Sequence, residues 1–300
     1  MIEEIIDENN ESFKNFVECY NLGASKQDIY DGKNKGFSIS KRSDANTPEL
    51  KRRRYRMALE EFKKIYGHKR YLVNPIDKHY GIKGKNILEF GCGTGALSVA
   101  LALKGAKVTG VDPSELQIEA CKHRANYFKI KDENFKPILV SQKPELGFDK
   151  KTFDMVITNS VMEFIPENRD KYIKDLISFV RDEGLFVVST ENGFFPVDYY
   201  TGMLFPLFRR EKCIRESMPY GMTYLELSKW VKDSGRKLKD LSIENKFNSI
   251  DKRLDLLKEN EKNILPLDIL NKSFKYVCRS LSIPSDIFFP YTTFIFKLKK

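Results

Sequence analysis

The residues with the clearest chemical potential are a carboxylate and three glycines within seven positions. They form the stretch Glu89-Phe90-Gly91-Cys92-Gly93-Thr94-Gly95. An apolar run around Ile87 precedes it, which predicts a buried strand, and residues 96–103 read as a helix. A strand, a tight glycine turn and a helix start bring backbone N–H groups close to a ligand. Glu89 favours a ligand that carries positive charge near the turn, because a carboxylate would repel a pyrophosphate.

The elements that position these residues alternate along the chain. We expect strands near 86–90, 107–111, 137–141, 153–158 and 184–189, and helices near 95–104, 114–127 and 167–182. Strands that alternate with helices predict a parallel sheet with right-handed crossovers. Ligands of such sheets bind at the carboxyl ends of the strands. Four polar side chains fall at these ends, and we expect them to share one cleft: Glu89, Asp112, Gln142 and Asn159.

The ordered landmarks resemble those of class I S-adenosylmethionine-dependent methyltransferases over residues 84–192. Asp112 lies 21 residues past Gly91, and the segments beginning at Phe153 and Gly184 resemble the family's fourth and fifth strands. The resemblance implies an α/β fold with a Rossmann-like, doubly wound, mostly parallel seven-stranded sheet, and S-adenosyl-L-methionine as the cofactor. It implies that Glu89 places the methionine end, that Asp112 holds the ribose and that Gln142 lies at the adenine. The full implied cofactor set is Glu89, Gly91, Cys92, Gly93, Thr94, Gly95, Asp112, Pro113, Ser114, Gln142 and Asn159.

Two features depart from the family pattern or admit another reading. Gln142 stands where the family often has an acid, but an amide oxygen can accept the same hydrogen bond. Many relatives have a histidine near the position of Phe164, and a phenylalanine side chain cannot act as a base there. The turn can also be read as Gly-x-Gly-x-x-Ala through Gly91, Gly93 and Ala96, which suits a dinucleotide. Glu89 and the fourth strand favour the methyltransferase over this alternative.

The N-terminal segment predicts helices that precede the core. Residues 1–20 have the spacing of an amphipathic helix, and residues 21–46 read as a mobile loop. A second helix is expected from Thr47-Pro48 to about Tyr66, ending at Gly67. It carries Lys51-Arg52-Arg53-Arg54-Tyr55-Arg56, which is either a solvated basic surface or a nucleic-acid patch.

The C-terminal third predicts a substrate lid and the end of the sheet. The segment from Glu191 to Gly202 weakly resembles bacterial methyltransferases suspected of acting on sugars or glycans. We expect a helix over 224–233, a strand over 238–243, a helical insertion over 249–282 and the last strand over 286–298. The chain is therefore divided into an N-terminal helical cap and loop (1–83), a cofactor core (84–192), and a lid, insertion and final strands (193–300).

A hydroxyl acceptor would need a general base, and four residues are candidates. Asp198 and Tyr200 lie in the aromatic lid segment, and His79 lies before the first strand. Glu163 is the fourth candidate, although an exposed carboxylate at a helix start is the simpler interpretation. No metal-ligand cluster is expected.

The amino-acid composition limits the classes of function and the cellular location that the sequence predicts. The 300-residue chain has a net charge of +10, and the excess lies in the segments that flank the core. It contains no apolar run long enough to predict a transmembrane helix, and its acidic start does not resemble a signal peptide. Scattered cysteines favour a reducing, cytoplasmic location. We predict O-methylation of a small-molecule or glycan-like acceptor. The alternatives are a nucleic-acid or lipid methyltransferase, or a catalytically inactive cofactor-binding scaffold.

Overall fold

The computed structural model describes residues 6–30, 48–141, 146–165, 167–193, 195, 211, 220–243, 265–289 and 291–300. The chain forms two compact units, Met1–Leu146 and Gly147–Lys300. The expected three-part division at residues 83 and 192 follows the family's functional regions and stays a prediction.

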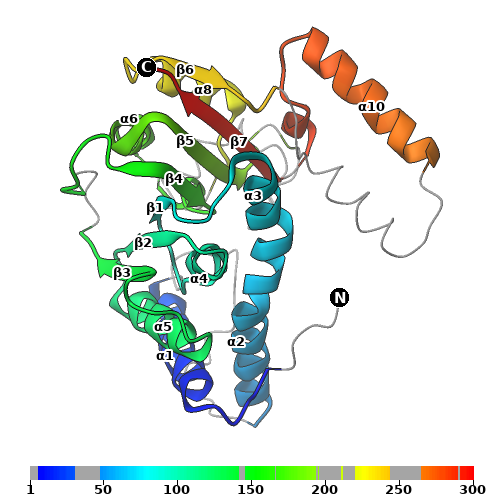
Figure 1. The fold of residues 1–300 in the computed structure, drawn as a ribbon. Helices are drawn as coiled ribbons and strands as arrows, with labels where there is room; N and C mark the ends of the chain where they lie inside the picture. The colour runs from blue at the N-terminus through cyan, green and yellow to red at the C-terminus, as the bar shows by residue number, and fades with distance from the viewer. Residues whose placement is uncertain are drawn as a thin grey trace. The chain divides into compact units, whose positions relative to one another are not determined.

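The first unit contains three parallel strands and the helices that pack on them (Figure 1). β1 pairs with β2, and β2 pairs with β3, all in parallel. Ile87 and Leu88 of β1 are fully buried, as expected of a strand covered on both faces. Its elements are α1 (Glu11–Tyr30), α2 (Pro48–His68), the π-helical turn η2 (Lys69–Val73), α3 (Asn74–Tyr80), β1 (Asn86–Phe90), α4 (Ala96–Leu103), β2 (Lys107–Asp112), α5 (Glu115–Tyr127) and β3 (Phe135–Leu139).

The second unit contains the other four strands. β4 and β5 are parallel, whereas β7 runs antiparallel to both β5 and β6. Its elements are β4 (Phe153–Asn159), the 3-10 turn η3 (Met162–Phe164), α6 (Arg169–Phe179), β5 (Val180–Glu191), α8 (Tyr224–Lys232), β6 (Leu238–Asp240), α10 (Leu265–Ser280), the 3-10 turn η5 (Ser285–Phe288) and β7 (Tyr291–Leu298).

The strand order confirms the predicted fold class. The seven strands follow the order β3-β2-β1-β4-β5-β7-β6. This is a mostly parallel, Rossmann-like sheet with flanking helices and an antiparallel last strand. In chain order, α10 precedes β7, which agrees with a helical insertion before the last strand.

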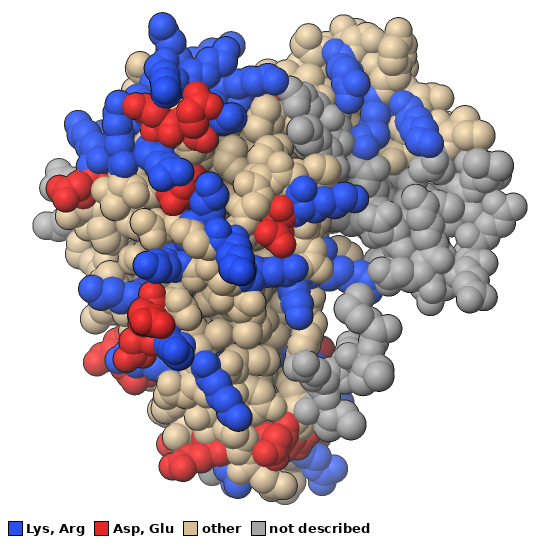
Figure 2. Space-filling view, in the orientation of Figure 1, with Lys and Arg blue, Asp and Glu red and all other residues tan. Residues whose placement is uncertain are grey.

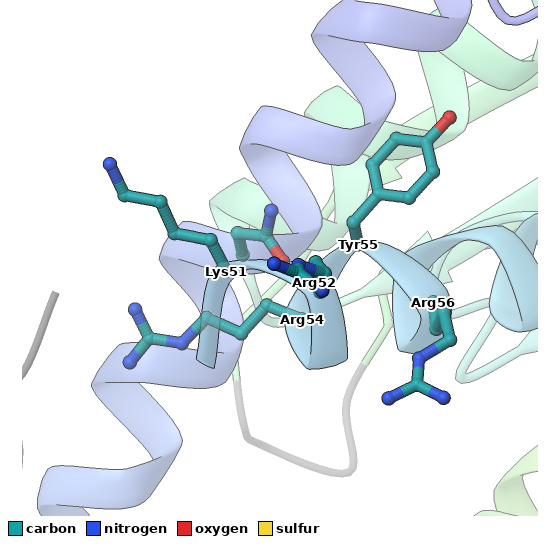
Figure 3. A pocket seen from close by; sticks show the side chains of 6 residues that line it. Lys51, Arg52, Arg54, Tyr55 and Arg56 are labelled. Carbon is teal, nitrogen blue, oxygen red and sulfur yellow. The ribbon is translucent and has the colours of Figure 1, made fainter. Parts of the chain in front are cut away.

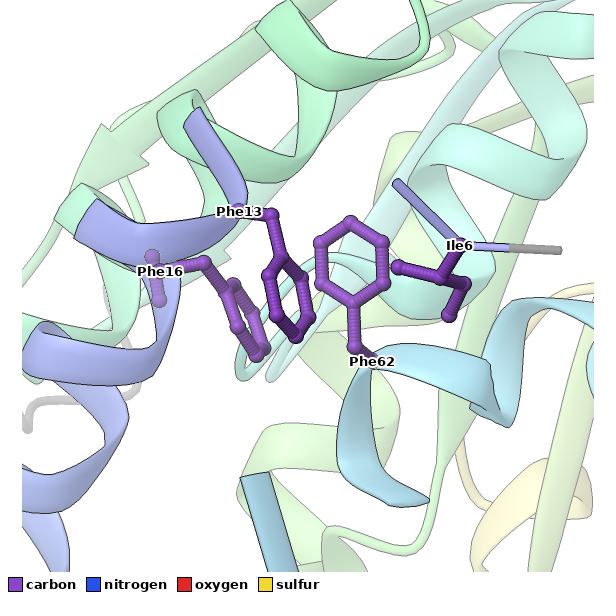
Figure 4. Packing of buried hydrophobic residues seen from close by; sticks show 5 residues of the cluster. Ile6, Phe13, Phe16 and Phe62 are labelled. Carbon is purple, nitrogen blue, oxygen red and sulfur yellow. The ribbon is translucent and has the colours of Figure 1, made fainter. Parts of the chain in front are cut away.

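Aromatic packing holds α1, α2 and α5 together (Figure 4). The Phe62 ring of α2 meets those of Phe13 and Phe16 of α1 edge to face, at centroid distances of 5.0 and 4.8 Å. It also meets Tyr127 of α5 at 5.0 Å. Each such pair contributes about 0.5–1.5 kcal/mol beyond its buried area. The N-terminal helices are therefore built into the first unit by apolar contacts.

The predicted boundaries of the N-terminal helices are wrong in two places. α1 begins at Glu11 and continues through residues 21–30, which were expected to be loop. It begins there because the Asn10 side chain accepts hydrogen bonds from the backbone N–H groups of Ser12 and Phe13. α2 also passes through Gly67 into η2 and α3, since Leu72 and Ile76 are buried beyond it. Their burial offsets the roughly 1 kcal/mol that a helical glycine costs.

The later boundaries shift by smaller amounts. β3 covers 135–139 instead of 137–141, because Phe135 is buried and pairs with Val108. β6 ends at Asp240, and β7 begins at Tyr291 after η5. The expected helical segment 249–282 is described only from Leu265, where α10 begins.

Candidate functional site

The glycine turn is held against the end of β2 by its own backbone. The N–H groups of Gly91 and Cys92 both donate to the Val111 carbonyl, at 2.8 and 3.0 Å. Gly91, Gly93 and Gly95 have φ angles of 74°, 52° and 78°, in the left-handed region that favours glycine. A Cβ added at Gly93 would meet nothing within 4 Å. The turn therefore has open space beside its backbone, where a ligand can approach.

Asp112 is joined to the same turn. Its Oδ2 accepts a hydrogen bond from the Gly93 N–H at 3.0 Å, and its Oδ1 accepts one from the Ser114 N–H at 2.9 Å. Burial raises the pKa of Asp112, against the two N–H donors, which favour the carboxylate. Each carboxylate oxygen can accept a second hydrogen bond. Asp112 can therefore hold the turn and accept from ligand hydroxyls together.

Glu89 is the most strongly perturbed acid of the turn. Its side chain is buried on β1, where Oε2 accepts a hydrogen bond from the Ser98 hydroxyl of α4. Burial raises the pKa of Glu89 to about 8, even though the bond from Ser98 acts to lower it. The carboxyl group is thus largely protonated near neutral pH. A cationic ligand nearby would favour its ionised form.

A second network, which the sequence did not predict, ties the turn to the N-terminal helices. Thr94 donates its hydroxyl proton to Oε1 of Glu61 on α2, at 2.8 Å. The fully buried Arg124 of α5 donates to the Thr94 carbonyl at 2.5 Å and to the Glu61 carbonyl at 2.7 Å. Its guanidinium lies over the rings of Phe16 and Phe62, 4.6 and 5.3 Å from their centroids.

The charges of this network compensate one another. Burial acts to raise the pKa of Glu61, but Lys64 and Arg124 outweigh it and hold that pKa below its usual value. Lys64 Nζ lies 2.6 Å from Glu61 Oε2. The only sequence signal for Arg124 was its position between apolar residues of α5, such as Cys121 and Ala125.

Cys92 behaves as a small buried filler of the turn. Its Sγ lies 3.8 Å from that of Cys121, whose thiol donates to the Gly93 carbonyl at 2.9 Å. The contact with Cys121, together with burial, raises the pKa of the Cys92 thiol well above its usual value. The nucleophilic thiolate is therefore disfavoured.

A side chain at Gly95 would meet both a close neighbour and an unfavourable backbone conformation. A Cβ there would lie 2.9 Å from Cys121 Sγ, at a φ of 78°. Gly84 has a matching φ of 75° but nothing within 4 Å. We expect Gly95→Ala to lower the free energy of unfolding by about 2–4 kcal/mol, and Gly84→Ala by only about 1–2 kcal/mol. Urea unfolding of the two variants measures the difference, and equal losses would contradict the close contact.

The remaining predicted site residues fall into three groups. His79 lies half-buried on α3 of the first unit. Asn159 lies at the end of β4 in the second unit, where its Oδ1 accepts from the Tyr291 hydroxyl at 3.2 Å. Gln142, Asp198 and Tyr200 lie outside the described residues.

The simpler interpretation of Glu163, an exposed carboxylate at a helix start, is wrong. Its side chain is buried, and Oε2 accepts a hydrogen bond from the Thr190 hydroxyl of β5 at 2.9 Å. The sequence pattern missed this because the partner lies on a strand 27 residues further along the chain.

The described part of the chain contains neither a candidate metal site nor a helix that could span a membrane. Among these residues, no group of His, Cys, Asp or Glu side chains could hold a metal ion. None of the described helices is both long and apolar enough to cross a membrane.

The first unit brings together the elements that a cationic, hydroxyl-bearing cofactor needs. Hydrogen bonds among β1, β2 and α4 hold Glu89 and Asp112 beside the open glycine turn. Two carboxyl groups beside the turn suit a ligand with a positive centre and hydroxyls, and they are unsuited to a pyrophosphate. S-adenosylmethionine has this chemistry, so the residues fit it.

Comparisons with known proteins agree with this chemistry. Residues 82–261 match a family described as a methyltransferase domain. A ubiquinone biosynthesis O-methyltransferase from Coxiella burnetii is 29% identical over 180 residues, which cover 57% of this chain and 74% of that protein. The protein of the same name from Pseudomonas paraeruginosa is 29% identical over 213 residues, covering 68% and 87%.

A solved structure is also similar to this chain. Phosphoethanolamine N-methyltransferase 2 from Haemonchus contortus, in complex with S-adenosyl-L-methionine, matches with a TM-score of 0.49 and 16% identity. The match covers 83% of this chain and 59% of that one.

Proposed function

This chain belongs to the class I S-adenosylmethionine-dependent methyltransferases, and we propose that it transfers the methyl group to a hydroxyl oxygen of a small-molecule acceptor. The observation that carries the proposal is the likeness to relatives named O-methyltransferases, which extends over 57–68% of this chain. Those relatives are named for ubiquinone biosynthesis, so the likeness lends no support to a sugar or glycan acceptor. An acceptor with a phenolic or catecholic hydroxyl is the chemical class that we infer.

The proposed cofactor roles follow from the contacts of the first unit. Bound S-adenosylmethionine supplies an electrophilic methyl group. We infer that Asp112 accepts hydrogen bonds from the ribose hydroxyls while it holds the Gly93 and Ser114 N–H groups. The open backbone of Gly93 lies against the ligand, and Glu89 compensates its positive charge. These residues bind and orient the cofactor, which is the protein's main task in an in-line displacement.

The acceptor hydroxyl must lose its proton to a base or to water. Of the four candidates, His79 and Glu163 belong to the described residues. The buried Glu163 carboxyl already accepts a hydrogen bond from Thr190, so one of its oxygens is engaged within the protein. His79 is the better candidate of the two, because imidazole is the commonest general base. Asp198 and Tyr200 stay candidates from sequence alone.

The activity is tested with S-adenosylmethionine that carries ¹³C in its methyl group. The protein is incubated with catechols, phenols, sugars and primary amines, and the products are analysed by NMR and mass spectrometry. We expect a labelled methyl ether on a phenolic oxygen and an equal amount of S-adenosylhomocysteine. Labelled methyl on nitrogen alone, or on sugars alone, would contradict the proposed acceptor class without affecting the cofactor.

Asp112→Ala should weaken S-adenosylmethionine binding by about tenfold to a hundredfold. The substitution removes a charged acceptor, and hydrogen bonds to charged groups are worth about 1.5–3 kcal/mol each. Isothermal titration calorimetry measures the affinity, and circular dichroism verifies that the variant is folded. The exposed Asp132→Ala, in the same unit, is the matched control and should bind as the wild type does. Unchanged affinity in folded Asp112→Ala would exclude the assigned role.

A further inference from the structure

The first two turns of α2 carry five cations within six residues: Lys51, Arg52, Arg53, Arg54 and Arg56. We call this set the α2 basic surface. Arg54 is partly buried, and the other four are exposed. Tyr55, in the middle of the run, points to the opposite side from Arg54 and Arg56 (Figure 3). Its hydroxyl donates to Glu8 at 2.5 Å, and its ring meets Phe13 edge to face at 6.3 Å.

The cations of this surface lack the pairing seen further along the same helix. Lys63 and Lys64 lie 3.9 and 2.6 Å from Glu60 and Glu61, each three residues earlier. Among the described residues, no carboxylate lies within ion-pair distance of any of the five cations. Among the described residues, Glu49 lies in the first turn of α2, and Glu8 accepts the hydrogen bond from Tyr55.

This arrangement opposes the stability of the free helix. A cation in the first turn of a helix interacts unfavourably with the helix dipole, by about 0.3–1 kcal/mol when exposed, and Lys51 has this position. Like charges three or four residues apart on a helix also repel one another, as Lys51 and Arg54 do here. Figure 2 shows lysine and arginine lying among acids over much of the visible face, whereas only cations are visible on α10. A bound polyanion would compensate the repulsion among the cations of the α2 basic surface and their unfavourable interaction with the helix dipole.

The surface is also hollowed. An open hollow of about 820 Å³ is lined by Asn21 of α1 and by Lys51, Arg52, Arg54, Tyr55 and Arg56 of α2 (Figure 3). The run from Lys51 to Arg56 rises about 7.5 Å along the helix axis. Even in a duplex, where one strand presents a phosphate about every 3.4 Å of axis, only two or three phosphates of that strand can face this stretch together.

We propose that the α2 basic surface binds the phosphodiester backbone of a single-stranded nucleic acid without reading its sequence. Four of the five cations are arginines, whose planar fork suits phosphate oxygens. The only aromatic ring of the run, that of Tyr55, contacts Phe13 edge to face and lines the hollow beside the cations. A lipid bilayer fits less well, because none of the exposed large apolar side chains among the described residues lies on α2. The proposal is independent of the proposed O-methylation.

The test is the salt dependence of binding to a fluorescein-labelled oligouridylate, measured by anisotropy. Three phosphate contacts predict a slope of log affinity against log salt of about −2.1, or roughly a twentyfold loss between 50 and 200 mM salt. The variant Arg52→Gln/Arg53→Gln/Arg56→Gln should reduce the slope to about −0.7, so that the loss is only about threefold. An oligothymidylate of the same length should bind with the same slope.

The controls separate a specific surface from general positive charge. The triple variant Lys122→Gln/Lys131→Gln/Lys136→Gln removes the same charge from exposed positions of the same unit and should keep the full slope. Calorimetric titration with S-adenosylmethionine verifies that both variants are folded. Three results would overturn the proposal: equal slope losses in the two variants, no binding of the oligonucleotide by the wild type, or binding only to phosphatidylserine vesicles.

Discussion

Replacing Arg124 with leucine should lower the free energy of unfolding by about 3–5 kcal/mol, the range expected when one partner of a buried charge network is removed. The Arg124 side chain is fully buried, and burial lowers its pKa only to about 10, so it stays charged at neutral pH. The substitution would leave the carbonyl oxygens of Thr94 and Glu61 without their donor. It would also remove the cation that lies over Phe16 and Phe62.

Urea unfolding followed by circular dichroism measures this loss. Arg56→Leu, at an exposed position of α2, is the matched control and should change stability by less than about 0.5 kcal/mol. Arg124→Lys should recover part of the loss, since an ammonium group can donate to one carbonyl but cannot bridge both as the guanidinium does. A loss below about 1 kcal/mol for Arg124→Leu would mean that the network does not hold the turn to the N-terminal helices.

The stability of the cofactor-free protein should fall as the pH rises from about 4.5 to about 8. Burial raises the pKa of Glu89 from its usual 4.5 to about 8 in the folded state. Within this window the folded state keeps a proton that the unfolded chain has lost, so raising the pH favours unfolding. Below this pH window the Glu89 carboxyl is protonated in both the folded and the unfolded protein, and above the window it is ionised in both. The expected slope is about 1.4 kcal/mol per pH unit, or on the order of 5 kcal/mol over the window.

Glu89→Gln isolates this contribution. Glutamine has a similar shape, keeps an oxygen that can accept from Ser98, and does not ionise. Chemical unfolding of both proteins between pH 5 and pH 8 should show the wild type losing more stability than the variant as the pH rises. Identical pH profiles would show that Glu89 is ionised in the folded state and that the buried, protonated carboxyl is not present.

The sequence was most informative where local chemistry sets the structure. The turn through Gly91, Gly93 and Gly95 needs positive φ angles, which glycine adopts readily. The spacing of these glycines in the sequence therefore predicts the turn. Asp112 could be placed because a parallel sheet brings the carboxyl ends of neighbouring strands together. Both inferences depend on short-range geometry and strand order.

The contacts that were missed join residues far apart in the sequence. Arg124 and Glu61 are 63 positions apart, and nothing in α2 or α5 alone shows that they meet. The local sequence of Glu163 resembles a helix start, which predicts an exposed side chain. The side chain is buried instead, because its hydrogen-bond partner Thr190 lies on β5. Gly67 looked like a helix end, because its conformational cost is local while the burial of Ile76 that offsets it is tertiary.

The most direct test of the account is a calorimetric titration of the purified protein with S-adenosylmethionine, S-adenosylhomocysteine and NAD. We expect micromolar binding of the first two ligands and none of NAD, because a positive charge on the ligand would favour the ionised form of Glu89, whereas Glu89 and Asp112 offer no positive charge to a pyrophosphate beside the turn. Binding of NAD alone would contradict the central claim and assign the glycine turn to a dinucleotide.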